Sequence, residues 1–337
     1  MSNLYWPVYK NLEKEVIDLS YSINFDDSQF EYIKSQEGNN IKSPPYSVKI
    51  GDLLIRCCTE IEALIQELTR GKEEEVKKTP TVDSKRPITT GCRLKYLHNN
   101  WSLNKKVVIV SCLSMYFQQD ENKSFYPFDY NKNGYDDYYS AYNAIKHNRS
   151  DQTIYKGNIR HLFRAIASLF LLNIYYKDEP IFLGKNSSTN SVPLNSDLFA
   201  VEAIRAAMTQ NDNSVKVTLG KFKETVSAVF LIKTTQEFKE REKEGSDEFM
   251  TLVNDKIREL LKNNPNQEIN ELRKRALQQV GQTKLWKTLE NTEYEAVTIK
   301  PEKIDFYVSQ GCSKDYTKEQ LDEIEEEAQL WKANIIT

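Results

Sequence analysis

The sequence lacks the motifs that identify several common protein classes. Its 337 residues contain no G-x-G-x-x-G loop, Walker-type loop, H-E-x-x-H motif or G-x-S-x-G motif, which excludes the usual signatures of nucleotide binding, zinc proteases and serine hydrolases. The five cysteines include no C-x-x-C pair, and the three histidines, His98, His147 and His161, lack a ligand-like arrangement. We therefore expect no metal and no cofactor.

Long apolar runs and an excess of charge of one sign are also missing. The longest apolar run, residues 162–176, contains Arg164, Ser168 and Asn173 and is shorter than the ~20 residues that span a bilayer. The N-terminal residues do not read as a signal peptide, so we expect a cytoplasmic protein without membrane contact. The formal net charge is only −3, and any phosphate-bearing partner must therefore bind a local patch.

Helical periodicity is the clearest pattern in the first half of the chain. Apolar residues at three- and four-residue spacings predict helices over residues 8–23 and 47–70, a third helix that ends near residue 148, and a very apolar helix capped by Asn158. The 337 residues are about twice the usual length of one domain, which predicts two structural units. We expect residues 1–185 to form an antiparallel bundle of four or five helices.

Two segments of this half are less regular. Residues 71–87 are charged, contain prolines and show no apolar period, which predicts a solvated loop. Residues 105–118 begin with a β-branched run and continue with apolar residues, so a strand and a helix fit equally well. We favour the helix.

The second half differs in composition. Residues 184–196 are rich in Ser and Asn, which is typical of a linker and places a domain boundary between residues 1–185 and 186–337. The fold class we expect is mainly α, with a mixed, mostly helical C-terminal part of unknown role. Its predicted elements are a strand over 214–219, helices over 221–243, 246–263 and 268–288, a small β-hairpin formed by 294–299 and 304–308, and a helix from Thr317.

Residues 142–149, with the sequence YNAIKHNR, contain the main candidates for binding and catalytic residues. Asn143 and His147 are four residues apart and so project from one helix face, with Lys146 alongside. The window from residue 142 to 164 carries five basic residues against one acidic residue, a net charge of +4. Its basic residues are Lys146, Arg149, Lys156, Arg160 and Arg164.

Such a set can act on phosphodiesters without a metal. Histidine can take or give a proton near neutral pH, and cations stabilise charge on a phosphate. His147 is then the candidate acid or base, Asn143 the residue that orients it, and Arg149 a bidentate phosphate ligand. The alternative is structural, because Asn and His one turn apart also form satisfied hydrogen-bonded pairs between helices.

The segment resembles the signature of the HEPN superfamily, which consists of helical bundles whose motif is Arg, a polar residue, three variable residues and His. Asn143 to His147 match the second part of this motif, whereas Tyr142 stands at the position of the Arg. The resemblance implies metal-independent RNase activity that depends on both Arg and His, so Arg149 or Arg160 would have to replace the missing arginine. It also implies that an acidic residue of the second helix, Glu60 or Glu62, lies near the motif.

Three functions follow as hypotheses. The first is a HEPN-like protein that acts on RNA, as an endoribonuclease in bacterial antiphage or toxin-type defence, with Lys146, Tyr142, Arg160 and Arg164 binding the substrate. The second is a non-catalytic HEPN-like binding or adaptor protein whose C-terminal part engages a protein partner. The third is a structural helical protein. The phrase AYNAIKHNR is also similar to bacterial proteins associated with mobile elements and defence, and the superfamily resemblance implies a homodimer with facing motifs.

Overall fold

The computed structural model describes most of the chain up to residue 300. The described ranges are 4–30, 33–34, 41–80, 86–129, 138–148, 153–185, 194–211, 214–219, 227–263, 267–281 and 292–300. The chain is mainly helical, with several short strands. None of the helices in these ranges is both long and apolar enough to cross a membrane.

The chain divides into two compact units that are interleaved in sequence. The first unit comprises Met1–Glu179, Asn190–Leu231 and Val297–Thr337, and the second comprises Pro180–Thr189 and Ile232–Ala296. The sequence prediction drew one boundary, after residue 185, whereas in the structure the chain returns to the first unit beyond that point. Strand pairing between distant segments causes this return, and such pairing leaves little trace in local composition.

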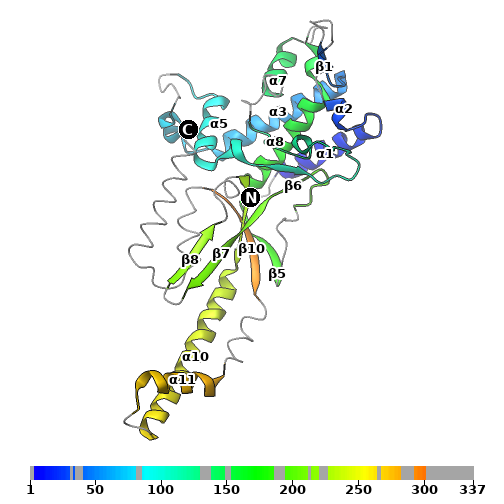
Figure 1. Cartoon of the computed structure of the whole chain (residues 1–337). Helices are drawn as coiled ribbons and strands as arrows, with labels where there is room; N and C mark the ends of the chain where they lie inside the picture. Colours follow the sequence, from blue (N-terminus) through cyan, green and yellow to red (C-terminus); the bar gives the residue numbers. More distant parts are fainter. Residues whose placement is uncertain are drawn as a thin grey trace. The chain divides into compact units, whose positions relative to one another are not determined.

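Helix α8 (Ile159–Lys177) is the centre of the first unit. Nearly all of its side chains are buried, and α1 (Tyr5–Ser20), α3 (Val48–Leu68) and α7 (Tyr138–His147) pack against it, as Figure 1 shows. The Asn158 side chain accepts a hydrogen bond from the backbone amide of His161 at 3.0 Å, which confirms the predicted cap. Four of the five helices predicted in this half are confirmed to within a few residues.

Shorter elements complete the helical part of this unit. They are α2 (Asp27–Phe30), α4 (Glu73–Lys78), α5 (Thr90–Trp101), α6 (Asp120–Lys123) and the 3-10 turns η1 (Leu103–Lys105) and η2 (Ile154–Lys156). Phe163 of α8 lies at the centre of an aromatic cluster. Its ring contacts those of Phe25, Phe30, Phe117, Phe125 and Phe199.

Three sequence predictions were wrong in type. Residues 73–78, expected within a loop, form α4, because three acidic residues in its first turn and two lysines in its last complement the helix dipole while Val76 is buried. The favoured helix over 105–118 is instead strand β3 (Val108–Val110). Within the helix predicted over 221–243, residues 230–234 form strand β9, and pairing with other strands prevails in both cases.

Small sheets join distant parts of the sequence. In the first unit, β3 pairs antiparallel with β4 (Ser124–Phe125) on one side and with β6 (Phe199–Val201) on the other. Strand β1 (Ile33–Lys34) pairs antiparallel with β2 (Ile41–Lys42), and β7 (Ala203–Asn211) pairs antiparallel with β8 (Ser214–Leu219). Strand β8 confirms the strand predicted over 214–219. The register Val108↔Val201 places the segment after residue 198 beside the helical core.

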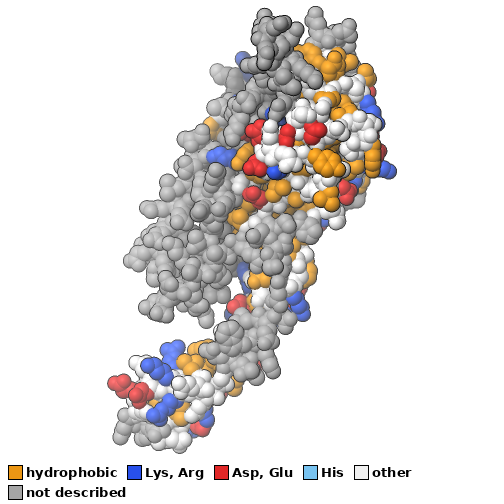
Figure 2. Space-filling view, turned by 45° about the vertical axis from the view of Figure 1, so that its right-hand side comes forward, with side chains coloured by type: hydrophobic (Ala, Val, Ile, Leu, Met, Phe, Trp, Pro, Cys, Tyr) orange, Lys and Arg blue, Asp and Glu red, His pale blue; other side chains and the backbone are white. Residues whose placement is uncertain are grey.

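The second unit holds most of β9 (Phe230–Thr234) and β10 (Glu293–Thr298), together with β5 (Ile181–Lys185), α10 (Gln236–Asn263) and α11 (Ile269–Val280). Strand β10 pairs antiparallel with β5; residues 304–308, its predicted partner, and the helix predicted from Thr317 lie outside the described residues. Phe249, Val253 and Ala276 form the small core between α10 and α11, and charged side chains gather on this helix pair in Figure 2.

The buried carboxylate of Glu13 links α1 by hydrogen bonds to residues 196–198, which precede β6. Oε1 of Glu13 accepts hydrogen bonds from the hydroxyls of Tyr9 at 2.7 Å and Ser196 at 2.5 Å. The backbone amides of Asp197 and Leu198 donate to the same oxygen at 3.0 and 3.1 Å. Because the Glu13 side chain is only 1% exposed, these four donors have little access to water as a substitute acceptor.

A buried lysine lies just before β3. The side chain of Lys106 is completely buried, and its Nζ donates a hydrogen bond to the carbonyl oxygen of Ala228 at 2.7 Å. The neighbouring Val107 amide donates to the Ser227 carbonyl at 3.1 Å, so two successive contacts hold these segments together. Desolvation of the ammonium group lowers the pKa of Lys106 from 10.5 to about 7.

Gly157 marks a close approach between the turn before α8 and helix α3. A Cβ atom added at Gly157 lies 2.9 Å from the Cα of Gly51, whereas a Cβ added at Gly51 meets Ile145 Cδ1 at an ordinary 3.8 Å. We expect Gly157→Ala to lower the free energy of unfolding by about 1–3 kcal/mol through overpacking. Gly51→Ala, within α3, should raise it by up to about 1 kcal/mol. Urea unfolding measures both, and equal effects would contradict the close approach.

Candidate functional site on helix α7

Helix α7 separates its side chains into a buried and an exposed face. Tyr142 and Ile145 are buried, at 0% and 3% exposure, on the side that packs against α3 and α8. Asn143, Lys146 and His147 are exposed. The three- and four-residue spacing therefore leaves the predicted polar residues on the outside of the helix and removes Tyr142 from the surface.

Four residues of α3 and α7 form a hydrogen-bonded cluster, which we call the Glu62 cluster. Tyr139 donates to Glu62 Oε1 at 2.6 Å, and Tyr142 donates to Oε2 at 3.2 Å. Lys146 Nζ in turn donates to the Tyr142 hydroxyl at 2.7 Å and lies 4.8 Å from the centroid of the Tyr142 ring. Tyr142 is thus an internal link between the Glu62 carboxylate and the surface lysine Lys146.

The cluster shifts the pKa values of two of its members. Desolvation, followed by the hydrogen bond to Glu62, raises the pKa of Tyr139, which keeps its hydroxyl protonated as a donor. The hydrogen bond to the Tyr142 hydroxyl raises the pKa of Lys146. Lys146 consequently stays cationic throughout the physiological pH range.

The two acidic candidates point to different neighbours. Glu62 faces α7 and belongs to the cluster, whereas Glu60 acts electrostatically on Tyr5 of α1. Glu60 and Glu62 are two positions apart in the sequence, which separates them by about 200° around the axis of α3. Only one of them can therefore face α7. Sequence spacing alone left these two residues as equal alternatives.

The two arginines of the next helix make other contacts. Arg160 donates to the carbonyl oxygen of Phe30 at 2.7 Å, and the guanidinium of Arg164 lies 5.2 Å from the centroid of the Phe125 ring. His161, also predicted within the basic window, is buried, with Nδ1 2.7 Å from the Lys156 carbonyl oxygen. Arg149 lies outside the described residues. Only Lys146 among these cations is tied to the Glu62 cluster by the contacts described here.

Comparisons with family models, curated proteins and solved structures find no match to this chain. The HEPN resemblance therefore rests on the sequence motif alone. Within the part of the chain that the structure describes, no group of three or more His, Cys, Asp or Glu side chains is arranged to hold a metal ion.

Sequence reasoning missed the role of the two tyrosines. Tyr139 lies one turn before Asn143 on α7, and its hydroxyl donates to Glu62. The available signal was the Tyr139/Tyr142 pair, three residues apart on one helix, opposite a helix with Glu62 beside its apolar stripe. The hydroxyl of a buried tyrosine usually needs a hydrogen-bond partner, and here the Glu62 carboxylate accepts from buried Tyr142 and from half-buried Tyr139.

Proposed function

We propose that this protein is a HEPN-like helical protein that binds RNA through the exposed face of α7 and does not cleave it. The observation that carries the proposal is the Tyr142–Lys146 contact, which fixes a surface cation beside Asn143 and His147. Tyr142 itself is 0% exposed and so cannot supply the substrate contact that the family draws from its arginine. Lys146 can bind a phosphate, but the arginine on which cleavage depends in the family is missing. We therefore propose binding without cleavage.

Lys146 is suited to phosphate binding by its fixed position. An ammonium group has three donors, of which one is used by the Tyr142 hydroxyl, and the others can reach phosphate oxygens. Contact with the Tyr142 hydroxyl and ring restricts a side chain that would otherwise lose much conformational entropy on binding. The exposed Asn143 amide adds a neutral donor on the same face.

Endoribonuclease activity is the second candidate. Asn143 and His147 are both exposed and one helical turn apart, so the imidazole is accessible to a ribose hydroxyl or a leaving oxygen. In this reading His147 transfers the proton, Lys146 stabilises phosphate charge, and Asn143 orients the ring or a phosphate oxygen. The position of Tyr142 makes this reading depend on a cation supplied from elsewhere, such as Arg149.

Fluorescence anisotropy with a short labelled single-stranded RNA tests the binding proposal. We expect Lys146→Ala to raise the Kd about three- to tenfold, as for the loss of one charge-assisted hydrogen bond. The slope of log Kd against log salt concentration should fall by about 0.7, the value for one phosphate contact on a single strand. Lys123→Ala, an exposed lysine on α6, is the matched control, and an equal loss there would contradict a specific role for α7.

Incubation of the same RNA with EDTA present separates the two candidates. The binding proposal predicts intact RNA with both the wild-type chain and a His147→Ala variant. Cleavage by the wild type that resists EDTA and disappears in His147→Ala would replace the binding proposal with the nuclease.

The proposal retains the homodimer and a role in bacterial defence, both of which rest on the resemblance. Facing motifs in a dimer would double the number of α7 cations available to one RNA strand. Analytical ultracentrifugation of the full chain measures the association state, and a strict monomer that still binds RNA would remove the dimer from the proposal. A protein partner for residues 186–337 is a separate part of the proposal, which affinity capture with the full chain addresses.

A further inference from the structure

The first unit contains a cavity that is lined by residues of α3, α5 and α7. Its volume is about 340 Å³, within the range of ~300–1,000 Å³ typical of small-molecule sites. Lys95, which lines it from α5, is exposed, whereas Ile61 and Ile65, which line it from α3, are buried. The cavity therefore extends from the surface into the packed interior of the unit.

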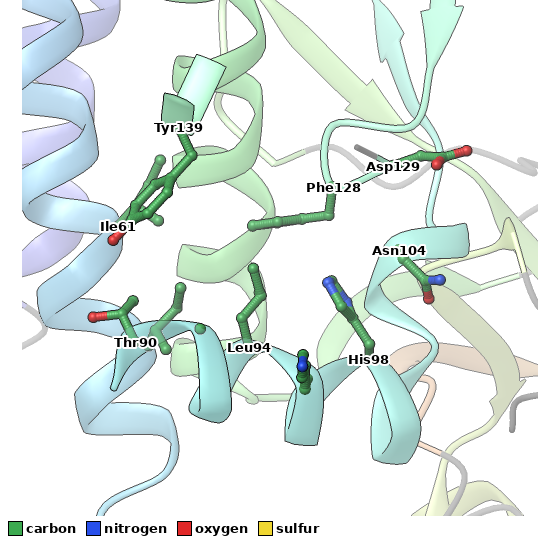
Figure 3. A pocket seen from close by; sticks show the side chains of 11 residues that line it. Ile61, Thr90, Leu94, His98, Asn104, Phe128, Asp129 and Tyr139 are labelled. Atoms are coloured by element: carbon green, nitrogen blue, oxygen red, sulfur yellow. The ribbon is translucent and has the colours of Figure 1, made fainter. Parts of the chain in front are cut away.

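Apolar side chains occupy the middle of this cavity, and polar residues lie at its edges. Leu94 and Phe128 are directed into one common space, with Thr90 on one side of it and Asn104 and Asp129 on the other (Figure 3). A flat ligand with apolar faces and polar edges matches this arrangement. Nucleobases have this character, and proteins recognise unpaired RNA bases by contacts with their faces and hydrogen bonds to their edges.

Tyr139 connects the cavity to the exposed face of α7. It lines the cavity, and its hydroxyl donates to the Glu62 carboxylate, which also accepts from Tyr142, the partner of Lys146. Tyr139 and Lys146 are seven residues apart, so they lie on nearly the same side of α7 and about 10 Å apart along its axis. A single strand whose phosphate binds Lys146 can therefore place a nearby base at the cavity.

We propose that this cavity takes up one unpaired purine base of an RNA strand whose phosphate binds Lys146. A dry apolar cavity of about 150 Å³ holds benzene, so about 340 Å³ accommodates the two fused rings of a purine. The Asn104 amide can both donate to and accept from the edge of a base, and the Lys95 ammonium can bind a phosphate oxygen of the inserted nucleotide. This inference rests on the proposed RNA binding and adds to it a preference for a purine.

Two short labelled RNAs that differ at a single position test the inference. One consists of uridines only, and the other has an adenosine at its centre. Fluorescence anisotropy with the full chain measures both Kd values. We expect the RNA with the adenosine to bind the wild type about fivefold more tightly, because a larger base fills more of the cavity.

Three variants separate the cavity from the phosphate contact. Leu94→Trp should fill the cavity and abolish the preference for adenosine, while the Kd for the uridine RNA stays unchanged. Lys146→Ala should raise both Kd values by the same factor and keep the preference. Leu113→Trp, at a position that is 95% exposed and outside the cavity lining, is the control for an added tryptophan and should bind both RNAs as the wild type does.

Asn104→Ala is the milder test and decides the question if Leu94→Trp does not fold. It removes one hydrogen-bonding group at a partly exposed position and should reduce the preference to about twofold. Equal Kd values for the two RNAs with the wild type would overturn the cavity inference and leave the proposed RNA binding intact. A full preference in folded Leu94→Trp or in Asn104→Ala would also overturn it. Absence of binding to either RNA would overturn the proposed function and this inference together.

Discussion

Replacing Glu13 by alanine is expected to lower the free energy of unfolding by about 3–5 kcal/mol. The substitution removes the acceptor shared by two hydroxyls and two backbone amides. The hydroxyls of Tyr9 and Ser196, 2.8 Å apart, can still bond each other, whereas each amide loses its acceptor at a cost of about 1–3 kcal/mol. Lys10, whose Nζ donates to Oε2 of Glu13 at 2.5 Å, would keep Asp197 as its other carboxylate partner. The loss should therefore come from the buried side of the carboxylate.

Glu15→Ala is the matched control for this prediction. Glu15 lies on the same helix and forms an ion pair with Arg56 at 2.7 Å, but both side chains are substantially exposed. Exposed pairs contribute about 0–1 kcal/mol, so this variant should unfold close to the wild type. Chemical denaturation followed by circular dichroism measures both, and a Glu13→Ala effect no larger than that of Glu15→Ala would show that the buried network does not stabilise the fold.

The second large effect concerns the pH dependence of stability. The pKa of Lys106 is about 7 in the folded protein and close to its ordinary 10.5 in the unfolded chain. Between these values the unfolded state binds a proton that the folded state does not, so the contribution of Lys106 to stability rises with pH across this window. The slope should approach about 1.4 kcal/mol per pH unit at its steepest. The contribution is complete above pH 10.5 and is lost as the pH falls to about 7.

A Lys106→Met variant isolates this contribution. Methionine keeps a long apolar side chain but cannot bind a proton, so the difference in unfolding free energy between wild type and variant should grow in favour of the wild type from pH 7 to pH 10. Lys105→Met, at a partly exposed neighbour, should retain the pH slope of the wild type. A constant difference between wild type and Lys106→Met over this range would mean that Lys106 is not desolvated in the folded state.

The Glu62 cluster and the Glu13 network show which side-chain contacts can be predicted from the sequence and which cannot. The resemblance named Glu60 and Glu62 as alternatives near α7, and the rotation of α3 relative to its neighbours directs Glu62 to Tyr139. The sequence around Glu13 does not predict its burial, because its partners Ser196, Asp197 and Leu198 are 183 to 185 residues away. Contacts of such separation depend on how the chain returns to itself.

His98 is a similar case. The sequence shows only that the three histidines lack a metal-ligand spacing, which is a statement about one kind of site. The burial of His98 Nδ1, which has no hydrogen-bond partner among the described residues, results only when α3, α5 and the loop with Phe128 pack around it. The chemistry of a cavity belongs to the packing of several elements, and each element taken alone looks like an ordinary amphipathic segment.

The sequence by itself determined the four main helices of the first unit, the Asn158 cap and the polar face of α7, because helix periodicity and capping are interactions within a few residues. Only the tertiary structure decided that 108–110 is a strand, that Tyr142 is an internal link, and that the chain after residue 189 rejoins the first unit. Strand pairing and burial depend on partners far away in the chain, and these partners are specified by packing rather than by local pattern.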